Sequence, residues 1–328
     1  MRLHRKRYIA RAIRKRRELR NVVNRTNEIR KGDILLFSTQ RNEKVRLPYF
    51  LEYYRDLGVD HFLIVDNDSD DGSVPYLAAQ RDVSVWHTKA SYKRARFGVD
   101  WLNYLKWRYA HGHWVLVVDP DEFFVYPFCD TRPLPALCDW LDDSEIRSFG
   151  AMLLDMYPKG RMDAQAYREG QNPLEIANWF DSGNYSIKPN PRYGNLWIQG
   201  GPRARRFFSE NPEKAPALNK TPLVKWKSSY VYLSSTHMLL PRGLNKVYDE
   251  RGGEKASGVL LHTKFLDAFS AKAAEELRRK QHYAASMEYK AYAEELKNHP
   301  DLWCKWSEKY INWRQLEILG LMSKGNWA

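Results

Sequence analysis

The spacing of apolar residues divides the first 130 residues into short, alternating elements. Four almost continuously apolar runs predict buried strands at 34–39, 61–66, 83–87 and 114–119. Three segments between them repeat apolar residues at helical spacing and predict helices at 47–57, 74–80 and 97–109. This alternation is typical of a mainly parallel sheet covered by helices on both faces. We therefore predict an α/β fold whose ligands bind beyond the carboxyl ends of the strands.

The second half of the chain has a weaker pattern. Apolar runs predict strands at 149–156, 230–233 and 259–262, whereas residues 157–230 are rich in Pro, Gly and Asn and predict long, ordered, substrate-binding loops. Helical spacing returns at 266–298 and again at 301–321. We expect an N-terminal extension (1–31), a main domain (32–265, with halves 32–128 and 129–265) and a helical C-terminal extension (266–328).

The N-terminal extension holds most of the positive charge. Residues 1–31 carry ten Arg and three Lys against Glu18 and Glu28, which is +11 of the net +13. The main domain is therefore almost neutral, which argues against nucleic-acid binding over a broad basic face. Residues 1–30 predict a helix, with two interpretations open: contact with an anionic membrane surface, or packing against the domain.

Composition limits the location of the protein. No apolar run is long enough to span a bilayer, and the N-terminus lacks the apolar stretch of a secretory signal. The three cysteines show no paired or metal-type spacing. We expect a cytoplasmic protein, with peripheral contact at the inner membrane face as a further option.

An acidic segment, Asp119-Pro120-Asp121-Glu122, follows the fourth predicted strand. Mg²⁺ and Mn²⁺ are usually held by one or two carboxylates together with substrate phosphates, and such an ion neutralises a departing diphosphate. The alternative is a solvated acidic turn. We predict that Asp119 and Asp121 hold a divalent cation and that Glu122 supports them.

Polar residues at the other strand ends suggest a nucleotide site. Asp66 and Asn67 follow the second strand and suit a base or ribose, although Asp66 would also suit a helix cap or turn. Thr39 and Arg41 end the first strand, and Arg94 lies in a basic stretch after the third, where arginines suit a diphosphate or simply face solvent. Three arginines in the loop 200–207 also suit an anionic or polyhydroxyl ligand.

In sequence order, Arg41-Asn42-Glu43, residues 65–72, Trp101-Leu102-Asn103 and residues 114–123 resemble the family 2 glycosyltransferases and their family 92-like bacterial relatives. The resemblance covers residues 33–128 and implies a GT-A fold, Mn²⁺ or Mg²⁺, and a nucleotide-diphosphate-sugar donor, with UDP-sugars favoured. It also implies that residues 32–128 bind the donor and 129–265 the acceptor. The nucleotide would be bound by Thr39, Arg41, Asp66, Asn67, Arg94 and Asp119, and the metal by Asp121, Asp119 and His262.

These features predict a metal-dependent glycosyltransferase that acts on a hydroxyl of a glycan or lipid-linked acceptor, with surface polysaccharide assembly as a role implied by the resemblance. We count Asp121, the expected metal ligand, among the catalytic residues. An inverting reaction also needs a general base, for which Asp155 is the first candidate, ahead of Asp181 and Asp163. Asp155 would also suit a structural role at a strand end. The rivals are a nucleotidyl or phosphoryl transferase, although no glycine-rich phosphate loop is found, and a non-catalytic protein that docks through residues 1–31.

Overall fold

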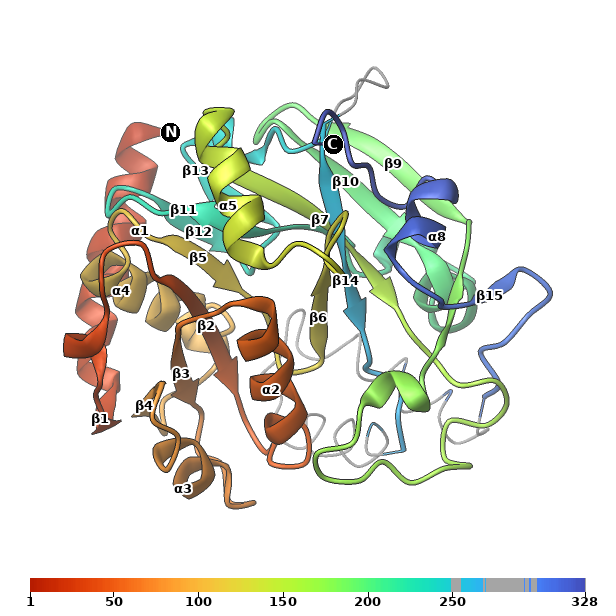
Figure 1. The fold of residues 1–328 in the computed structure, drawn as a ribbon, viewed down its shortest axis with the longest axis horizontal. Helices are drawn as coiled ribbons and strands as arrows, with labels where there is room; N and C mark the ends of the chain where they lie inside the picture. Colours follow the sequence, from red (N-terminus) through yellow and green to blue (C-terminus); the bar gives the residue numbers. More distant parts are fainter. Residues whose placement is uncertain (249–254, 268, 270–291, 293–294, 296–299, 328) are drawn as a thin grey trace.

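A nine-stranded sheet forms the centre of the molecule in the computed structural model, which describes residues 1–248, 255–267, 269, 292, 295 and 300–327 (Figure 1). The strand order is β1-β4-β3-β2-β5-β11-β7-β14-β6. Strands β4, β3, β2 and β5 are parallel neighbours, as are β7 and β14, whereas β1, β11 and β6 run antiparallel to their neighbours. The bounds of these strands are Arg20–Val23 (β1), Ile34–Gln40 (β2), His61–Asp66 (β3), Val83–His87 (β4), Trp114–Val117 (β5), Glu122–Val125 (β6), Ser148–Asp155 (β7), Asn219–Lys225 (β11) and Ser257–His262 (β14).

Helices cover both faces of this sheet, so the predicted α/β class is confirmed. Alternate residues of β2 point to opposite faces: Leu36 packs with α2 (Leu47–Leu57) and α5 (Leu134–Asp143), whereas Leu35 and Phe37 pack with α4 (Val99–Tyr109). Strands β2 and β3 are buried on both faces, which explains why their sequences are almost continuously apolar.

The strand–helix pattern of the first half is also confirmed. Helix α2 has the predicted bounds, because Gly58 adopts a left-handed backbone (φ 104°) that ends it. The short helix α3 (Ser73–Ala78) and α4 begin and end within two residues of their predicted bounds. The fourth strand is shorter than predicted, since β5 ends at Val117 and the acidic segment turns directly into β6.

The N-terminal extension is not one helix, contrary to the prediction for residues 1–30. Helix α1 spans Arg2–Lys15, and after a 3₁₀ turn the chain forms β1, which pairs with β4 at the edge of the central sheet. Helix α1 packs on α4, where Arg11 Nε lies 2.7 Å from Asp100 Oδ2. The sequence left open whether this helix packs against the domain or contacts a membrane. The structure shows that its inner side packs against the domain.

The segment 157–230 is not only loop, as the sequence suggested. It contains β8 (Trp179–Asp181), β9 (Tyr185–Asn190) and β10 (Asn195–Gly200), a π-helical turn at Arg203–Phe207, and the central strand β11. Strand β11 escaped the sequence pattern because it carries Asn219, Lys220, Thr221 and Pro222 although almost all of it is buried. Two predicted strands are found as β12 (Val231–Ser234), which pairs with β13 (Met238–Leu240), and β14.

The helix predicted at 266–298 lies almost entirely outside the described residues. The helix predicted at 301–321 is wrong in its first half, where β15 (Ser307–Lys309) pairs with β8, and is found only as α8 (Trp313–Ile318). Trp313 and Trp327 pack against Phe128, so the end of the chain belongs to the main core. Among the helices that the structure describes, none combines the length and the apolar character needed to cross a bilayer.

Candidate functional site

The acidic segment forms a tight turn between β5 and β6. The backbone N–H of Glu122 donates to the carbonyl of Asp119 at 3.0 Å, and the N–H of Asp119 donates to the Glu122 carboxylate at 3.2 Å. Strands β2, β3, β5, β7 and β14 all end at this edge of the sheet, because the antiparallel β11 lies between β5 and β7 and keeps their directions alike. The turn therefore lies where ligands bind in open α/β sheets.

Glu122 is a buried, paired residue. Lys220 of β11 reaches it at 3.0 Å, and both side chains are at most 6% exposed. Burial alone would lower the pKa of Lys220, but the charges of Glu122 and Asp119 raise it above its ordinary value. Glu122 thus anchors a lysine beneath the turn, and its carboxylate faces away from solvent.

His262 lies beside Asp121, with Nε2 3.4 Å from Oδ2. The pairing of β14 with β6 places His262 opposite Glu122, and the N–H of Thr263 donates to the carbonyl of Asp121 at 2.8 Å. The structure therefore brings together two residues that are 141 positions apart and that the sequence assigned to the same metal.

Asp155 supports His262 from the other side. The parallel pairing of β7 and β14 places the two residues in register, and His262 Nδ1 donates to Asp155 Oδ1 at 2.7 Å. Arg203, from the π-helical turn, donates from Nε to the second carboxylate oxygen at 2.7 Å. The hydrogen bond between His262 and Asp155 fixes the proton on Nδ1 of His262 and directs Nε2 towards Asp121.

The general base predicted at Asp155 disagrees with this geometry. Asp155 is 2% exposed, and each of its oxygens already accepts a hydrogen bond. Burial would raise its pKa, but the charges of Arg203 and His262 lower it below the ordinary value. In this structure Asp155 is held in its ionised form by two donors, and one of its oxygens fixes the ring of His262.

The two aspartates of the turn differ in their electrostatics. Asp119 has exposed surface at the turn. Desolvation by the protein packed around its carboxyl group, and then the charge of Glu122, raise its pKa to about 7. Burial would also raise the pKa of Asp121, but the charge and hydrogen bond of His262 lower it strongly. Asp121 in turn raises the pKa of His262 against the effect of burial. The turn thus presents one firmly ionised carboxylate and one that a nearby cation would ionise.

The donor set at Asp121 and His262 suits a divalent cation. One carboxylate oxygen and one imidazole nitrogen lie close to the separation of about 3 Å expected for two adjacent ligands of one ion. Within the described ranges, no group of three or more His, Cys, Asp or Glu side chains is arranged to hold a metal. Two ligands from the described residues would fit an ion that takes its remaining ligands from substrate phosphates and water.

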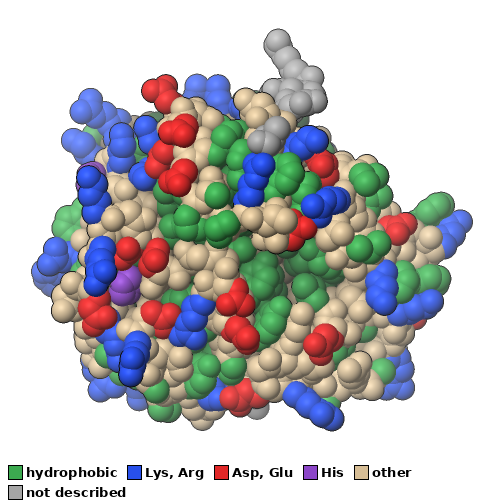
Figure 2. Space-filling model, viewed as in Figure 1, with side chains coloured by type: hydrophobic (Ala, Val, Ile, Leu, Met, Phe, Trp, Pro, Cys, Tyr) green, Lys and Arg blue, Asp and Glu red, His purple; other side chains and the backbone are tan. Residues whose placement is uncertain are grey.

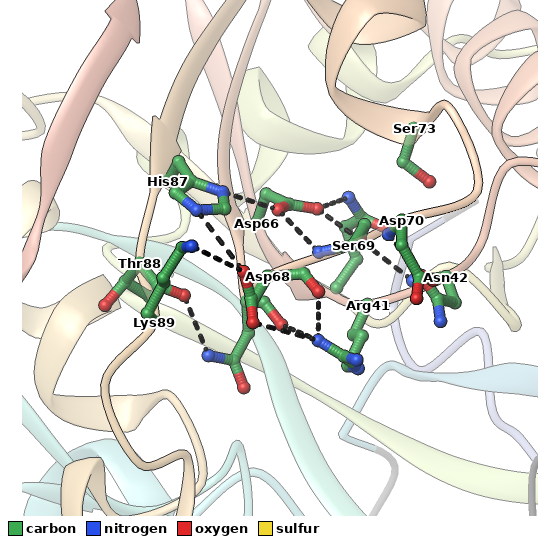
Figure 3. A network of polar contacts seen from close by, with 12 residues as sticks. Arg41, Asn42, Asp66, Asp68, Ser69, Asp70, Ser73, His87, Thr88 and Lys89 are labelled. Carbon is green, nitrogen blue, oxygen red and sulfur yellow. Dashed lines mark hydrogen bonds and ion pairs between the residues drawn. The ribbon is translucent and has the colours of Figure 1, made fainter. Parts of the chain in front are cut away.

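The predicted nucleotide residue Asp66 is used within its own loop (Figure 3). It has no exposed surface, and its carboxylate accepts hydrogen bonds from Gln40, His87 and both the N–H and hydroxyl of Ser69. This is the turn-stabilising alternative that the sequence left open, and the binding of a base or ribose by Asp66 stays a prediction.

Asn67 and Arg41 brace the same loop. The Asn67 amide donates to the carbonyls of Thr88 and Ala90 at 3.0 and 3.1 Å, and Arg41 donates to the carbonyls of Asn67 and Asp68. Figure 3 shows Asp68 between Arg41, His87 and Lys89, and its side chain is 46% exposed. Through these contacts Asn67 and Arg41 hold the loop after β3 in place.

Thr39 and Arg94 lie near the start of α4. Thr39 packs against Gly98, and its buried hydroxyl has no hydrogen-bond partner among the described residues. Arg94 is exposed, and its backbone carbonyl accepts from Arg11. The described contacts join neither residue to the Asp121–His262 pair.

The two reserve candidates for a general base also lie elsewhere. Asp181 is buried and accepts hydrogen bonds from Tyr157 and Arg205, whereas the exposed Asp163 pairs with Arg161. Sequence reasoning missed Lys220, whose strand carried no signal, and it assigned Arg203 to a ligand when the residue in fact pairs with Asp155.

No family model and no curated protein matches this chain. Many solved structures are similar to parts of it, among them the two that follow. A 4-diphosphocytidyl-2C-methyl-D-erythritol synthase is 21% identical over 44% of this chain and 67% of its own, with a TM-score of 0.26. A putative glucose-1-phosphate thymidylyltransferase from Bacillus anthracis, solved with sucrose, is 9% identical over 81% of this chain and 83% of its own, with a TM-score of 0.29. Scores this low support no conclusion about function, and membership of glycosyltransferase family 2 is not shown by these comparisons.

Proposed function

We propose that this chain is a metal-dependent glycosyltransferase that moves a sugar from a nucleotide-diphosphate-sugar to a hydroxyl acceptor. The observation that carries the proposal is the contact between Asp121 and His262, with Asp155 and Arg203 behind it, at the carboxyl edge of the sheet. The resemblance of residues 33–128 to family 2 glycosyltransferases also supports it, through the same Asp119–Glu122 segment.

In this proposal Asp121 and His262 bind the cation and Asp119 lies at the open side of the turn, towards the donor. A bound Mn²⁺ or Mg²⁺ would neutralise charge on the departing nucleoside diphosphate. Asp155 holds the ring of His262 so that Nε2 stays directed at the metal position, and Lys220 keeps Glu122 from competing for the ion. The base that would activate an acceptor hydroxyl is left unassigned, because Asp155 is engaged.

The direct test is a thermal-shift screen of UDP-, GDP- and TDP-sugars with and without Mn²⁺. A nucleotide-sugar that binds the folded state should raise the melting temperature only when metal is present. Asp121→Asn should abolish the metal-dependent shift, and Asp163→Asn, which changes an exposed carboxylate, should leave it intact.

Product analysis separates this activity from its rivals. A glycosyltransferase releases nucleoside diphosphate from the nucleotide-sugar. A nucleotidyltransferase joins a nucleoside triphosphate to a sugar phosphate and releases pyrophosphate from the triphosphate. Pyrophosphate release without any nucleoside diphosphate would replace the proposal with nucleotidyl transfer. Binding without turnover of either substrate pair would favour a non-catalytic protein.

A further inference from the structure

The outward face of α1 carries several basic residues and no acidic one. Packing on α4 divides the helix, because Arg11 and Ala12 face the domain while other positions point away from it. The outward positions recur at helical spacing and are all exposed: Arg2, Leu3, Lys6, Arg7, Ala10 and Arg14. We call these six residues the α1 outer face.

The cations of the α1 outer face take no part in docking the helix. A different basic residue docks the helix, since Arg11 pairs with Asp100. Within the part of the chain that the structure describes, none of the four outward cations is paired with a carboxylate. Figure 2 shows Lys and Arg side chains gathered along the edge of the molecule that α1 occupies in Figure 1. This charge is therefore available to a partner.

Apolar side chains lie at the start of the same helix. Leu3 is 78% exposed and Met1 53% exposed, beside Arg2 and Lys6. Exposed cations next to apolar tips are typical of helices that lie in the headgroup region of a membrane. Single-stranded nucleic acids are usually bound by aromatic stacking along a basic groove, but the α1 outer face contains no aromatic residue.

We propose that the α1 outer face docks the protein on an anionic phospholipid surface. The helix, about 21 Å long at 1.5 Å per residue, would lie parallel to the surface. Its four cations would contact lipid phosphates, and Met1 and Leu3 would enter the interface. This inference does not depend on the proposed glycosyl transfer. Each basic residue near an anionic leaflet strengthens binding about fivefold, so loss of four should weaken it by about two to three orders of magnitude.

The test is co-sedimentation of the full chain with vesicles of phosphatidylcholine alone or mixed with phosphatidylglycerol. Binding should require phosphatidylglycerol and weaken steeply with added salt. The variant R2Q/K6Q/R7Q/R14Q should lose this binding, whereas R2K/R7K/R14K should keep it because the charge is unchanged. The matched control removes four exposed cations from other elements (R192Q/K227Q/R242Q/K309Q) and should bind like the parent protein.

Two further arms complete the test. Leu3→Ser should weaken vesicle binding severalfold at constant charge, because less apolar surface enters the interface. Fluorescence anisotropy with duplex and single-stranded RNA at the same ionic strength measures binding to nucleic acid, the alternative polyanionic partner. The proposal is overturned by equal binding to neutral vesicles, by equal losses in the two Gln variants, or by tighter binding to RNA than to anionic vesicles. Salt and lipid dependence are measured on the parent protein, so these two readouts do not rest on any variant folding.

Discussion

Arg11 Nε lies 2.7 Å from Asp100 Oδ2, so a carboxylate with no exposed surface fastens the N-terminal helix to α4. Arg96 reaches the other oxygen of Asp100 and stacks over Tyr8 of the same N-terminal helix. Deleting residues 1–31 would remove Arg11 and the edge strand β1 together. Such a deletion tests the integrity of the fold as well as docking, which makes point variants the better tool.

We expect Asp100→Asn to destabilise the protein by about 3 kcal/mol, because removing one partner of a buried ion pair leaves the other charges uncompensated. The value is at the lower end of the usual range, since Arg11 and Arg96 are partly exposed. Urea denaturation measures the change in the free energy of unfolding. Glu213→Gln, in the solvent-exposed pair with Lys188, should cost less than about 1 kcal/mol. Equal costs for the two variants would show that Asp100 does not anchor the helix.

Asp155→Asn should lower metal affinity and any metal-dependent turnover by about 10- to 100-fold while the protein stays folded. An amide can still contact His262, but it no longer provides the charge that orients the Nδ1–H group. Titration of Mn²⁺ by calorimetry, alongside activity, gives both readouts. Should Asp155→Asn retain full metal affinity and lose only turnover, with an altered pH–rate profile, the original assignment of Asp155 as general base would be restored.

The pH dependence of stability should reveal the lowered pKa of His237, a partly buried residue. Its Nδ1–H group donates to the carbonyl of Asn219 at 2.6 Å, and burial followed by the charge of Lys220 lowers its pKa to about 3. The unfolded chain has a histidine pKa of about 6.5. The folded state therefore binds fewer protons, so this stabilising contribution is complete above about pH 6.5 and is lost as the pH falls towards 3.

His237→Gln is the matching variant. It should be less stable than the parent protein at pH 7.5, and the difference between the two should shrink at pH 5. Free energies of unfolding at several pH values between 7.5 and 4 give this comparison. A difference that stays constant over this range would mean that His237 does not titrate on unfolding.

Gly98→Ala should destabilise the protein through two separate effects. Gly98 has φ +75°, and an added Cβ would lie 2.7 Å from Thr39 Oγ1. Left-handed backbone costs a non-glycine residue about 1–2 kcal/mol, and the clash adds to that cost. Gly112→Ala provides a matched control, because Gly112 has φ +87° with nothing within 4 Å of an added Cβ.

The clash can be isolated by a double variant. Thr39→Ala combined with Gly98→Ala should recover the part of the loss due to contact, and leave the cost of the backbone conformation. Thermal or urea unfolding of the four proteins completes the cycle. If Gly98→Ala costs no more than Gly112→Ala, the strand end and the helix start are less tightly packed than the distances indicate.

The first half of the fold could be predicted because its signals are local. The apolar residues of β2 and β3 and the helical spacing of α2 arise from burial on both faces of a parallel sheet and on one face of a helix. Strand β11 could not be found in this way. Its Lys220 is tolerated in the interior only because Glu122, 98 positions away, compensates the charge.

By itself, the sequence determined that an acidic turn follows a buried strand, and it assigned Asp119, Asp121 and His262 to one site. Only the tertiary structure decided which strand-end residues remain open to a ligand. Asp66 and Asp155 look alike in the sequence, each at the end of an apolar run, but both are consumed by hydrogen bonds from distant strands and loops. The reason is physical: a carboxylate's role depends on which donors surround it, and strand pairing brings those donors together across tens of residues.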